Sequence, residues 1–125
     1  KYVLIEMSTL TEASNLFNVI FQLKTKGYQP ILAHPERYIY YADQLDKFEK
    51  AKSMGCQLQV NLLSLSGYYG AAQKKLGIAL LKAGLVDFLG TDLHRISQVA
   101  HLERAMNDQT VRKLFKKISF KNSDL

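Results

Sequence analysis

Four short apolar runs recur along this chain of 125 residues, starting roughly every 26 to 29 residues. Each run is followed by a segment whose apolar residues repeat at helical spacing. This spacing is too long for hairpins but fits parallel strands that are joined by crossover helices. We therefore predict an α/β fold built from four parallel βα units. Because a complete β/α barrel takes about 250 residues, the chain is expected to form about half of one.

The predicted strands cover residues 1–6, 31–33, 57–62 and 85–90. A capping box, Thr9 to Glu12, is expected to open the first helix. The following helices are predicted to begin near residues 43, 71, 97 and 108, with Ser97 and Asp108 as caps of the last two. We expect residues 1–125 to form a single domain whose polar tail, 119–125, frays.

Composition excludes several classes of protein. The formal net charge is +6, but the basic residues lie on the polar faces of predicted helices and in a loose C-terminal group. A solvated surface is therefore favoured over nucleic-acid binding. No apolar run reaches the length of a membrane span. The single cysteine, Cys56, rules out an intrachain disulfide and favours a reducing, cytoplasmic compartment.

The second predicted strand ends abruptly in His34, Pro35, Glu36 and Arg37. Pro35 removes a backbone donor and favours an extended conformation at His34, so the strand should stop there. Loops that follow the carboxyl ends of parallel strands carry the chemistry in such folds. The alternative is structural, with His34 bonded to a backbone carbonyl and Arg37 capping a helix.

Polar side chains stand at the ends of all four predicted strands, where parallel strands would bring them to one rim. They are Glu6, His34, Asn61 or Ser64, and Asp92 with His94. Two carboxylates and two imidazoles form a ligand set that suits Mn, Fe or Zn. In the structural alternative, Glu6 pairs with Arg37 and the histidines bond to backbone carbonyls. Asn61 as a strand-end cap and His101 on the polar side of its helix are favoured as structural.

Such a rim favours phosphate-ester hydrolysis. The Arg37 guanidinium can clamp two phosphate oxygens and stabilise charge on the transferred group. Bound metal ions can supply a hydroxide at neutral pH. No other nucleophile is visible, because Leu62 stands where a cysteine phosphatase would have an arginine six positions after Cys56. No phosphate loop ending in Gly-Lys-Ser or Gly-Lys-Thr is present.

The segment 31–38, Ile-Leu-Ala-His-Pro-Glu-Arg-Tyr, resembles a segment of the PHP-superfamily protein-tyrosine phosphatases of bacterial capsule and exopolysaccharide operons, the CpsB type. Residues 3–6, 58–67 and 88–94 are similar to that family in the same order. The resemblance implies a distorted, TIM-like barrel of seven strands. Its rim would hold a metal cluster, usually Mn, that hydrolyses phosphotyrosine on the tail of a tyrosine kinase.

Carried over by position, the resemblance implies metal ligands at Glu6, His34, Asp92 and His94, and phosphate binding by Arg37. A second phosphate-binding arginine of the family has no sure match, since Arg95, His101 and Arg104 are all near the expected place. The family's His-x-His motif does not occur in this sequence. The chain thus resembles the C-terminal portion of the family's domain, with an incomplete metal cluster.

Three readings stay open on this basis. The first is a phosphotyrosine phosphatase to which this chain contributes half the site, the isolated chain being inactive or nearly so. The second is another PHP-type phosphoesterase that acts on a small phosphate or a nucleic-acid end. The third is a non-enzymatic fragment. In each case an unpaired strand edge, at residues 1–6 or 86–90, is expected to cause self-association.

Overall fold

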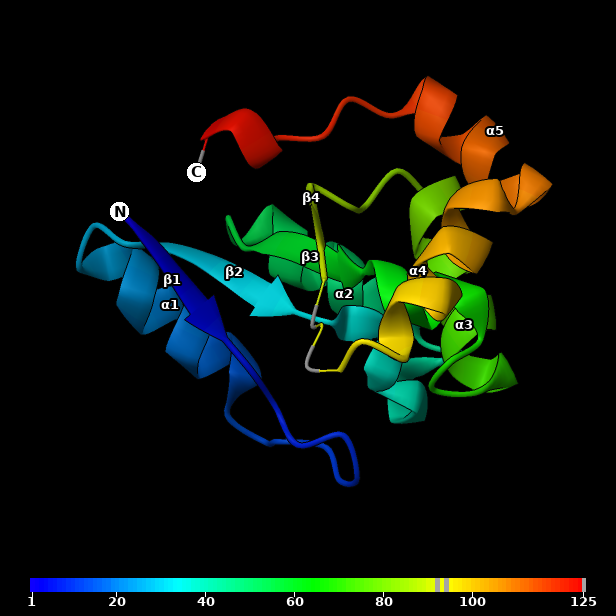
Figure 1. Cartoon of the computed structure of the whole chain (residues 1–125). Coiled ribbons are helices and arrows are strands. Elements are labelled where there is room, and N and C mark those ends of the chain that lie inside the picture. Colours follow the sequence, from blue (N-terminus) through cyan, green and yellow to red (C-terminus); the bar gives the residue numbers. More distant parts are fainter. Residues whose placement is uncertain (92, 94, 125) are drawn as a thin grey trace.

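The computed structural model describes residues 1–91, 93 and 95–124, and it shows one sheet of four parallel strands in the order β1-β2-β3-β4 (Figure 1). The strands are β1 (Tyr2–Ile5), β2 (Gln29–Ala33), β3 (Gln57–Asn61) and β4 (Phe88–Gly90). A crossover helix joins each strand to the next. The prediction of an α/β fold with parallel βα units is confirmed.

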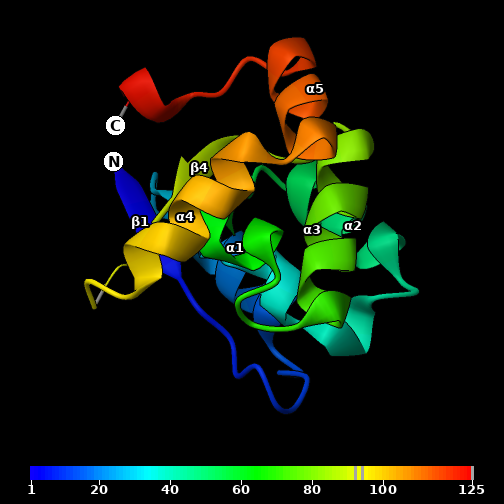
Figure 2. The ribbon, with the colours of Figure 1, turned by 45° about the vertical axis from the view of Figure 1, so that its right-hand side comes forward.

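The helices are α1 (Leu16–Thr25), α2 (Leu45–Ser53), α3 (Ala71–Lys82), α4 (Gln98–Asn107) and α5 (Gln109–Lys117). Short 3-10 turns cover Pro35–Arg37, Ile39–Tyr41, Leu62–Ser66 and Asn122–Asp124. Figures 1 and 2 show α1 alongside β1 and β2, with α4 and α5 following β4 on the side of α3. None of the described helices is both long and apolar enough to cross a membrane.

The two faces of the sheet differ in chemistry because side chains alternate along each strand. Leu32, Leu58 and Val60 point to the helix-covered face and are fully buried in the main apolar core. The opposite face carries Ala33 beside Gln59, which the strand register makes direct neighbours. That second face is more polar, and it opens onto the carboxyl ends of the strands.

The predicted start of the first helix is wrong. The helix α1 begins at Leu16 rather than within the expected capping box. The Ser8 hydroxyl instead accepts the backbone N–H of Leu10, at 3.1 Å, in a local turn. The Glu12 carboxylate accepts the hydroxyl of Tyr41, at 3.0 Å. Glu12 thus accepts a hydrogen bond from a residue far along the chain instead of capping the first helix.

Of the two predicted caps near the C-terminus, one is confirmed. Asp108 accepts the backbone N–H of Val111 at 3.1 Å and so caps α5. Ser97 stands at the cap position of α4 but makes no side-chain capping bond. Its backbone is already helical there, so its hydroxyl is not directed at the free N–H groups of the first turn.

The described part of the C-terminal tail contacts β4, and the fraying of residues 119–125 stays a prediction. The Asn122 side chain donates to the carbonyl of Leu89 at 2.7 Å and accepts its N–H at 3.0 Å. The Lys121 N–H also donates to the Asp87 carbonyl at 2.8 Å. The Asn122 amide therefore bonds both backbone groups of Leu89, as a neighbouring strand would, and covers part of the outer edge of β4. Figures 1 and 2 show the turn at Asn122–Asp124 on the same side of the molecule as the N-terminus.

The outer edge of β1 has no strand partner among the described residues, since β1 pairs only with β2. Open edges of this kind recruit strands from other chains. We therefore expect self-association through β1, and expect Leu4→Lys to weaken it, because Leu4 is 56% exposed in that strand. Sedimentation velocity over a range of concentrations measures it. Leu10→Lys, the same change at an exposed position outside the sheet, is the control. A wild-type chain that stays monomeric at all concentrations would contradict the expectation.

Candidate functional site

His34 leaves the sheet in a strained backbone conformation. Its N–H still donates to the Gln59 carbonyl, at 2.9 Å, but its φ of 38° and ψ of 57° are left-handed. The expectation that β2 stops here is confirmed, and the expectation of an extended His34 is wrong. The His34 carbonyl accepts the N–H of Arg37, at 2.9 Å, which closes the tight turn after Pro35. A left-handed residue other than glycine costs about 1–2 kcal/mol, and such strain is concentrated at functional sites.

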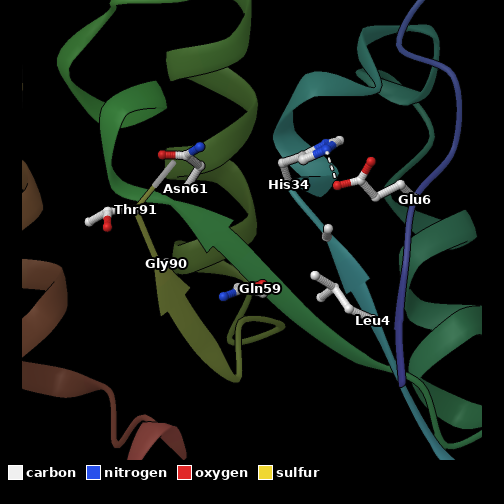
Figure 3. A pocket seen from close by; sticks show the side chains of 8 residues that line it. Leu4, Glu6, His34, Gln59, Asn61, Gly90 and Thr91 are labelled. Atoms are coloured by element: carbon white, nitrogen blue, oxygen red, sulfur yellow. Dashed lines mark ion pairs between the residues drawn. The ribbon is translucent and has the colours of Figure 1, made fainter. Parts of the chain in front are cut away.

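The His34 imidazole faces the carboxylate of Glu6, with 3.5 Å between Nε2 and Oε1 (Figure 3). The His34 side chain is 13% exposed and that of Glu6 is 64% exposed, so the pair lies at the border of solvent. The other ring nitrogen, Nδ1, is buried and has no hydrogen-bond partner among the residues that the structure describes. Two ligand atoms about 2.1 Å from one ion at a tetrahedral angle are about 3.4 Å apart. The observed separation and the nitrogen–oxygen donor set therefore fit a shared metal ion.

A cavity of about 170 Å³ opens beside this pair at the carboxyl ends of the strands. It lies on the sheet face opposite to the helices (Figure 3). Its lining residues are Leu4, Glu6, Ala33, His34, Gln59, Asn61, Gly90 and Thr91. The space suits an ion with a few waters or a small oxyanion better than a large organic ligand, which requires about 300 Å³ or more.

Two of the predicted metal ligands, Asp92 and His94, lie outside the described residues, so their role stays a prediction. Among the residues that the structure describes, no group of three or more His, Cys, Asp or Glu side chains could hold a metal ion. Glu6 and His34 are the two predicted ligands that the structure brings together. Thr91, which directly follows β4, lines the opposite side of the same cavity.

Arg37, the predicted phosphate clamp, does not line the cavity. Its guanidinium carbon lies 4.3 Å from the centre of the Tyr69 ring, in a cation–π contact. The structural alternative in which Glu6 pairs with Arg37 is not what is seen, because the ion pair of Glu6 is with His34. Arg37 thus contacts Tyr69 and is not among the residues that line the cavity, and phosphate binding by Arg37 stays a prediction.

The three residues considered for a second phosphate-binding role lie away from the cavity lining. The His101 ring packs against Tyr68, with 4.8 Å between ring centroids, and its Nδ1 is 3.4 Å from a guanidinium nitrogen of Arg104. Arg95 is exposed, and its backbone N–H donates to Gln98. Their roles also stay predictions.

Glu36 is a fully buried acid directly behind the rim. Its Oε2 accepts the backbone N–H of Asn61 at 3.2 Å and the hydroxyl of Ser64 at 2.5 Å, while Oε1 has no partner within the described part of the chain. Burial raises the pKa of this carboxyl from 4.5 to about 7, against the lowering effect of its hydrogen bonds and of Arg37. Glu36 ties the loop after β2 to the end of β3.

Cys56 is not available as a nucleophile. Its side chain is buried, and burial raises the pKa of the thiol to about 12. The thiolate, which is the reactive form, is therefore absent at neutral pH. This agrees with the lack of a cysteine phosphatase loop in the sequence.

Sequence reasoning missed Glu36, Gln59, Tyr69 and Thr91 as parts of the site or its support. One available signal was the alternation in β3, where Gln59 and Asn61 share a face while Leu58 and Val60 share the other. Polar residues on one face of a buried strand indicate a polar cavity. No comparable sequence signal marks the contact of Tyr69 with Arg37.

The fold and the site together define a class: a β/α protein with a candidate metal centre, the His34–Glu6 pair, at the C-terminal ends of its parallel strands. Residues 1–124 match the family described as Capsular polysaccharide synthesis, CpsB/CapC. The chain belongs to this CpsB/CapC family.

Curated relatives lie at modest identity. The chain is 28% identical over 119 residues to the putative tyrosine-protein phosphatase CapC of Staphylococcus aureus, covering 94% of this chain and 47% of the relative. It is 29% identical over 96 residues to the tyrosine-protein phosphatase YwqE of Bacillus subtilis, covering 77% of this chain and 38% of the relative. The chain thus spans about half or less of the length of these relatives.

The fold comparison agrees. The chain superposes with a TM-score of 0.70 and 24% identity on a chain from the crystal structures of YwqE from Bacillus subtilis and CpsB from Streptococcus pneumoniae, described as metal-dependent tyrosine phosphatases. The match covers 92% of this chain and 50% of that one. The fold of this chain therefore corresponds to about half of that structure.

Proposed function

We propose that the whole protein is a metal-dependent protein-tyrosine phosphatase and that this chain supplies part of its metal rim. The carrying observation is the Glu6–His34 pair, 3.5 Å apart at the carboxyl ends of two parallel strands. Membership of the CpsB/CapC family supports the proposal. So do the relatives named as tyrosine phosphatases.

In this proposal Glu6 and His34 hold one or more divalent ions, with Asp92 and His94 as further ligands. Mn²⁺ is the proposed metal, with Fe or Zn as alternatives for the same donor set. The bound metal would lower the pKa of a water molecule and polarise the phosphate ester. Arg37 would bind the phosphate and stabilise the charge that develops on it.

The proposed substrate is phosphotyrosine on another protein, namely the tail of a tyrosine kinase of capsule or exopolysaccharide synthesis. The likeness to tyrosine-protein phosphatases supports phosphotyrosine as the substrate, and membership of a family of capsular polysaccharide synthesis supports the setting. The buried, unpaired Cys56 suits a reducing compartment, and we place the reaction in the cytoplasm.

The isolated chain is expected to be inactive or nearly so, because only two ligands meet among the described residues. This observation also keeps a second candidate open for the chain taken alone, that of a non-enzymatic fragment. A different PHP-type phosphoesterase is the alternative for the whole protein.

The test compares the whole protein with the isolated chain on a phosphotyrosine peptide, with Mn²⁺ added or chelated. We expect metal-dependent hydrolysis by the whole protein and a rate near background for the chain. Histidinol phosphate and DNA with a 3′-phosphate serve as competing substrates. Preference for either of these would replace the tyrosine phosphatase by another phosphoesterase, and absence of all hydrolysis would refute an enzymatic role.

A further inference from the structure

The side chain of Asn61, at the end of β3, is held in one orientation. It is 6% exposed, and its Oδ1 accepts the backbone N–H of Leu63 at 2.9 Å. That bond also decides which end of the amide is oxygen, because a nitrogen at this place would face another donor. The amide nitrogen Nδ2 therefore has a defined direction.

The backbone of Asn61 is equally constrained. Its N–H donates to the buried carboxylate of Glu36 at 3.2 Å, and its strand register pairs it with Gly90. The Nδ2 group has no hydrogen-bond partner in the described part of the chain, yet Asn61 lines the rim cavity. In Figure 3 the nitrogen lies on the side of the Asn61 amide that faces His34. A fixed donor thus stands at the cavity wall across from the Glu6–His34 pair.

The chemistry of that wall favours an anion. An amide NH₂ group only donates hydrogen bonds, so it does not contribute to binding a cation. Thr91, beside it in the cavity lining, has a hydroxyl that can donate as well. Arg37 is outside this lining, so any donor in addition to Arg37 would come from the cavity wall itself. A donor that is already oriented binds charge without being reorganised.

We propose that Asn61 is a positioning residue whose Nδ2 donates a hydrogen bond to an oxygen of the phosphate group bound in the rim cavity. This inference rests on the proposed phosphatase function and names a phosphate contact within it. The cavity then has two sides, with metal-binding groups on Glu6 and His34 and a neutral donor on Asn61. The substrate phosphate would lie between them.

The decisive variant is Asn61→Asp. A carboxylate keeps an oxygen for the N–H of Leu63, so the local turn is retained, but it replaces the donor by a negative charge. Asn18→Asp is the matched control, because it changes charge equally at an exposed position in α1. The probe is inorganic phosphate, titrated into the chain in the presence of a chelator. NMR follows the Asn61 side-chain amide in the wild type and in Asn18→Asp, and the backbone amide of residue 61 gives the affinity in all three proteins.

We expect a saturable shift of that amide signal in the wild type and in Asn18→Asp, and binding at least about tenfold weaker in Asn61→Asp. No saturable shift in the wild type, or equal affinity in Asn61→Asp, would overturn the inference. If Asn61→Asp does not fold, the wild-type amide signal alone decides.

The inference and the proposed function fail in different ways. Phosphate binding at Asn61 without hydrolysis by the whole protein would sink the function and leave the contact standing. Hydrolysis that orthophosphate inhibits equally in the wild type and in Asn61→Asp would sink the contact and leave the function standing.

Discussion

Replacing His34 by asparagine is expected to abolish metal binding while leaving the fold intact. Asparagine is among the few residues that tolerate the left-handed backbone seen here, with φ at 38°. The change therefore removes the imidazole without adding backbone strain. Removing a residue that only hydrogen-bonds to a metal ligand typically weakens metal binding about 10- to 100-fold. Loss of a direct ligand should therefore weaken metal binding at least about 100-fold.

Competition with a fluorescent chelator for Mn²⁺ or Zn²⁺ measures this affinity, and phosphotyrosine hydrolysis by the whole protein should fall to background in parallel. His101→Asn is the control for metal affinity alone, because His101 packs on Tyr68 and is not among the residues that line the cavity. Unchanged metal affinity in His34→Asn, with the circular dichroism spectrum preserved, would refute His34 as a ligand. Comparison with His34→Ala separates loss of the imidazole from backbone strain.

Replacing Glu36 by glutamine is expected to remove a large pH dependence of stability. Burial raises the pKa of Glu36 from 4.5 to about 7, so the folded chain binds a proton that the unfolded chain releases. The folded state is thus stabilised below pH 4.5, and this stability is lost as pH rises through 7. At about 1.4 kcal/mol for each pH unit between the two values, the loss is on the order of 3 kcal/mol.

Urea unfolding between pH 4.5 and pH 8, with a chelator present, measures the free energy of unfolding. The wild type should lose on the order of 3 kcal/mol more than Glu36→Gln across this range. Glu49→Gln, at an exposed position in α2, should behave like the wild type. Parallel pH curves for the wild type and Glu36→Gln would show that folding does not raise the pKa of Glu36.

Much of the fold was predictable because it depends on local periodicity. The apolar runs and helical repeats indicated each strand and its crossover helix, and parallel pairing followed from their spacing. The start of α1 was not predictable, because Glu12 bonds Tyr41 across 29 residues rather than capping its own helix. The contacts of Asn122 with β4 were not predictable either, because they join residues 33 positions apart in the chain.

The candidate site divides in the same way. Glu6 and His34 were predicted to meet because both follow parallel strands, and they do meet. The left-handed backbone of His34 was not predicted, since the effect of Pro35 alone favours an extended residue. The turn closed by Arg37 overrides that local preference.

The sequence by itself determined the order of strands and helices and which polar side chains stand at strand ends, because these depend on near neighbours along the chain. Only the tertiary structure decided where those side chains point. It turned Arg37 onto Tyr69, buried Glu36 beneath β3 and fixed the Asn61 amide at the cavity wall. These outcomes depend on contacts between residues far apart in the chain, whose energies no local pattern records.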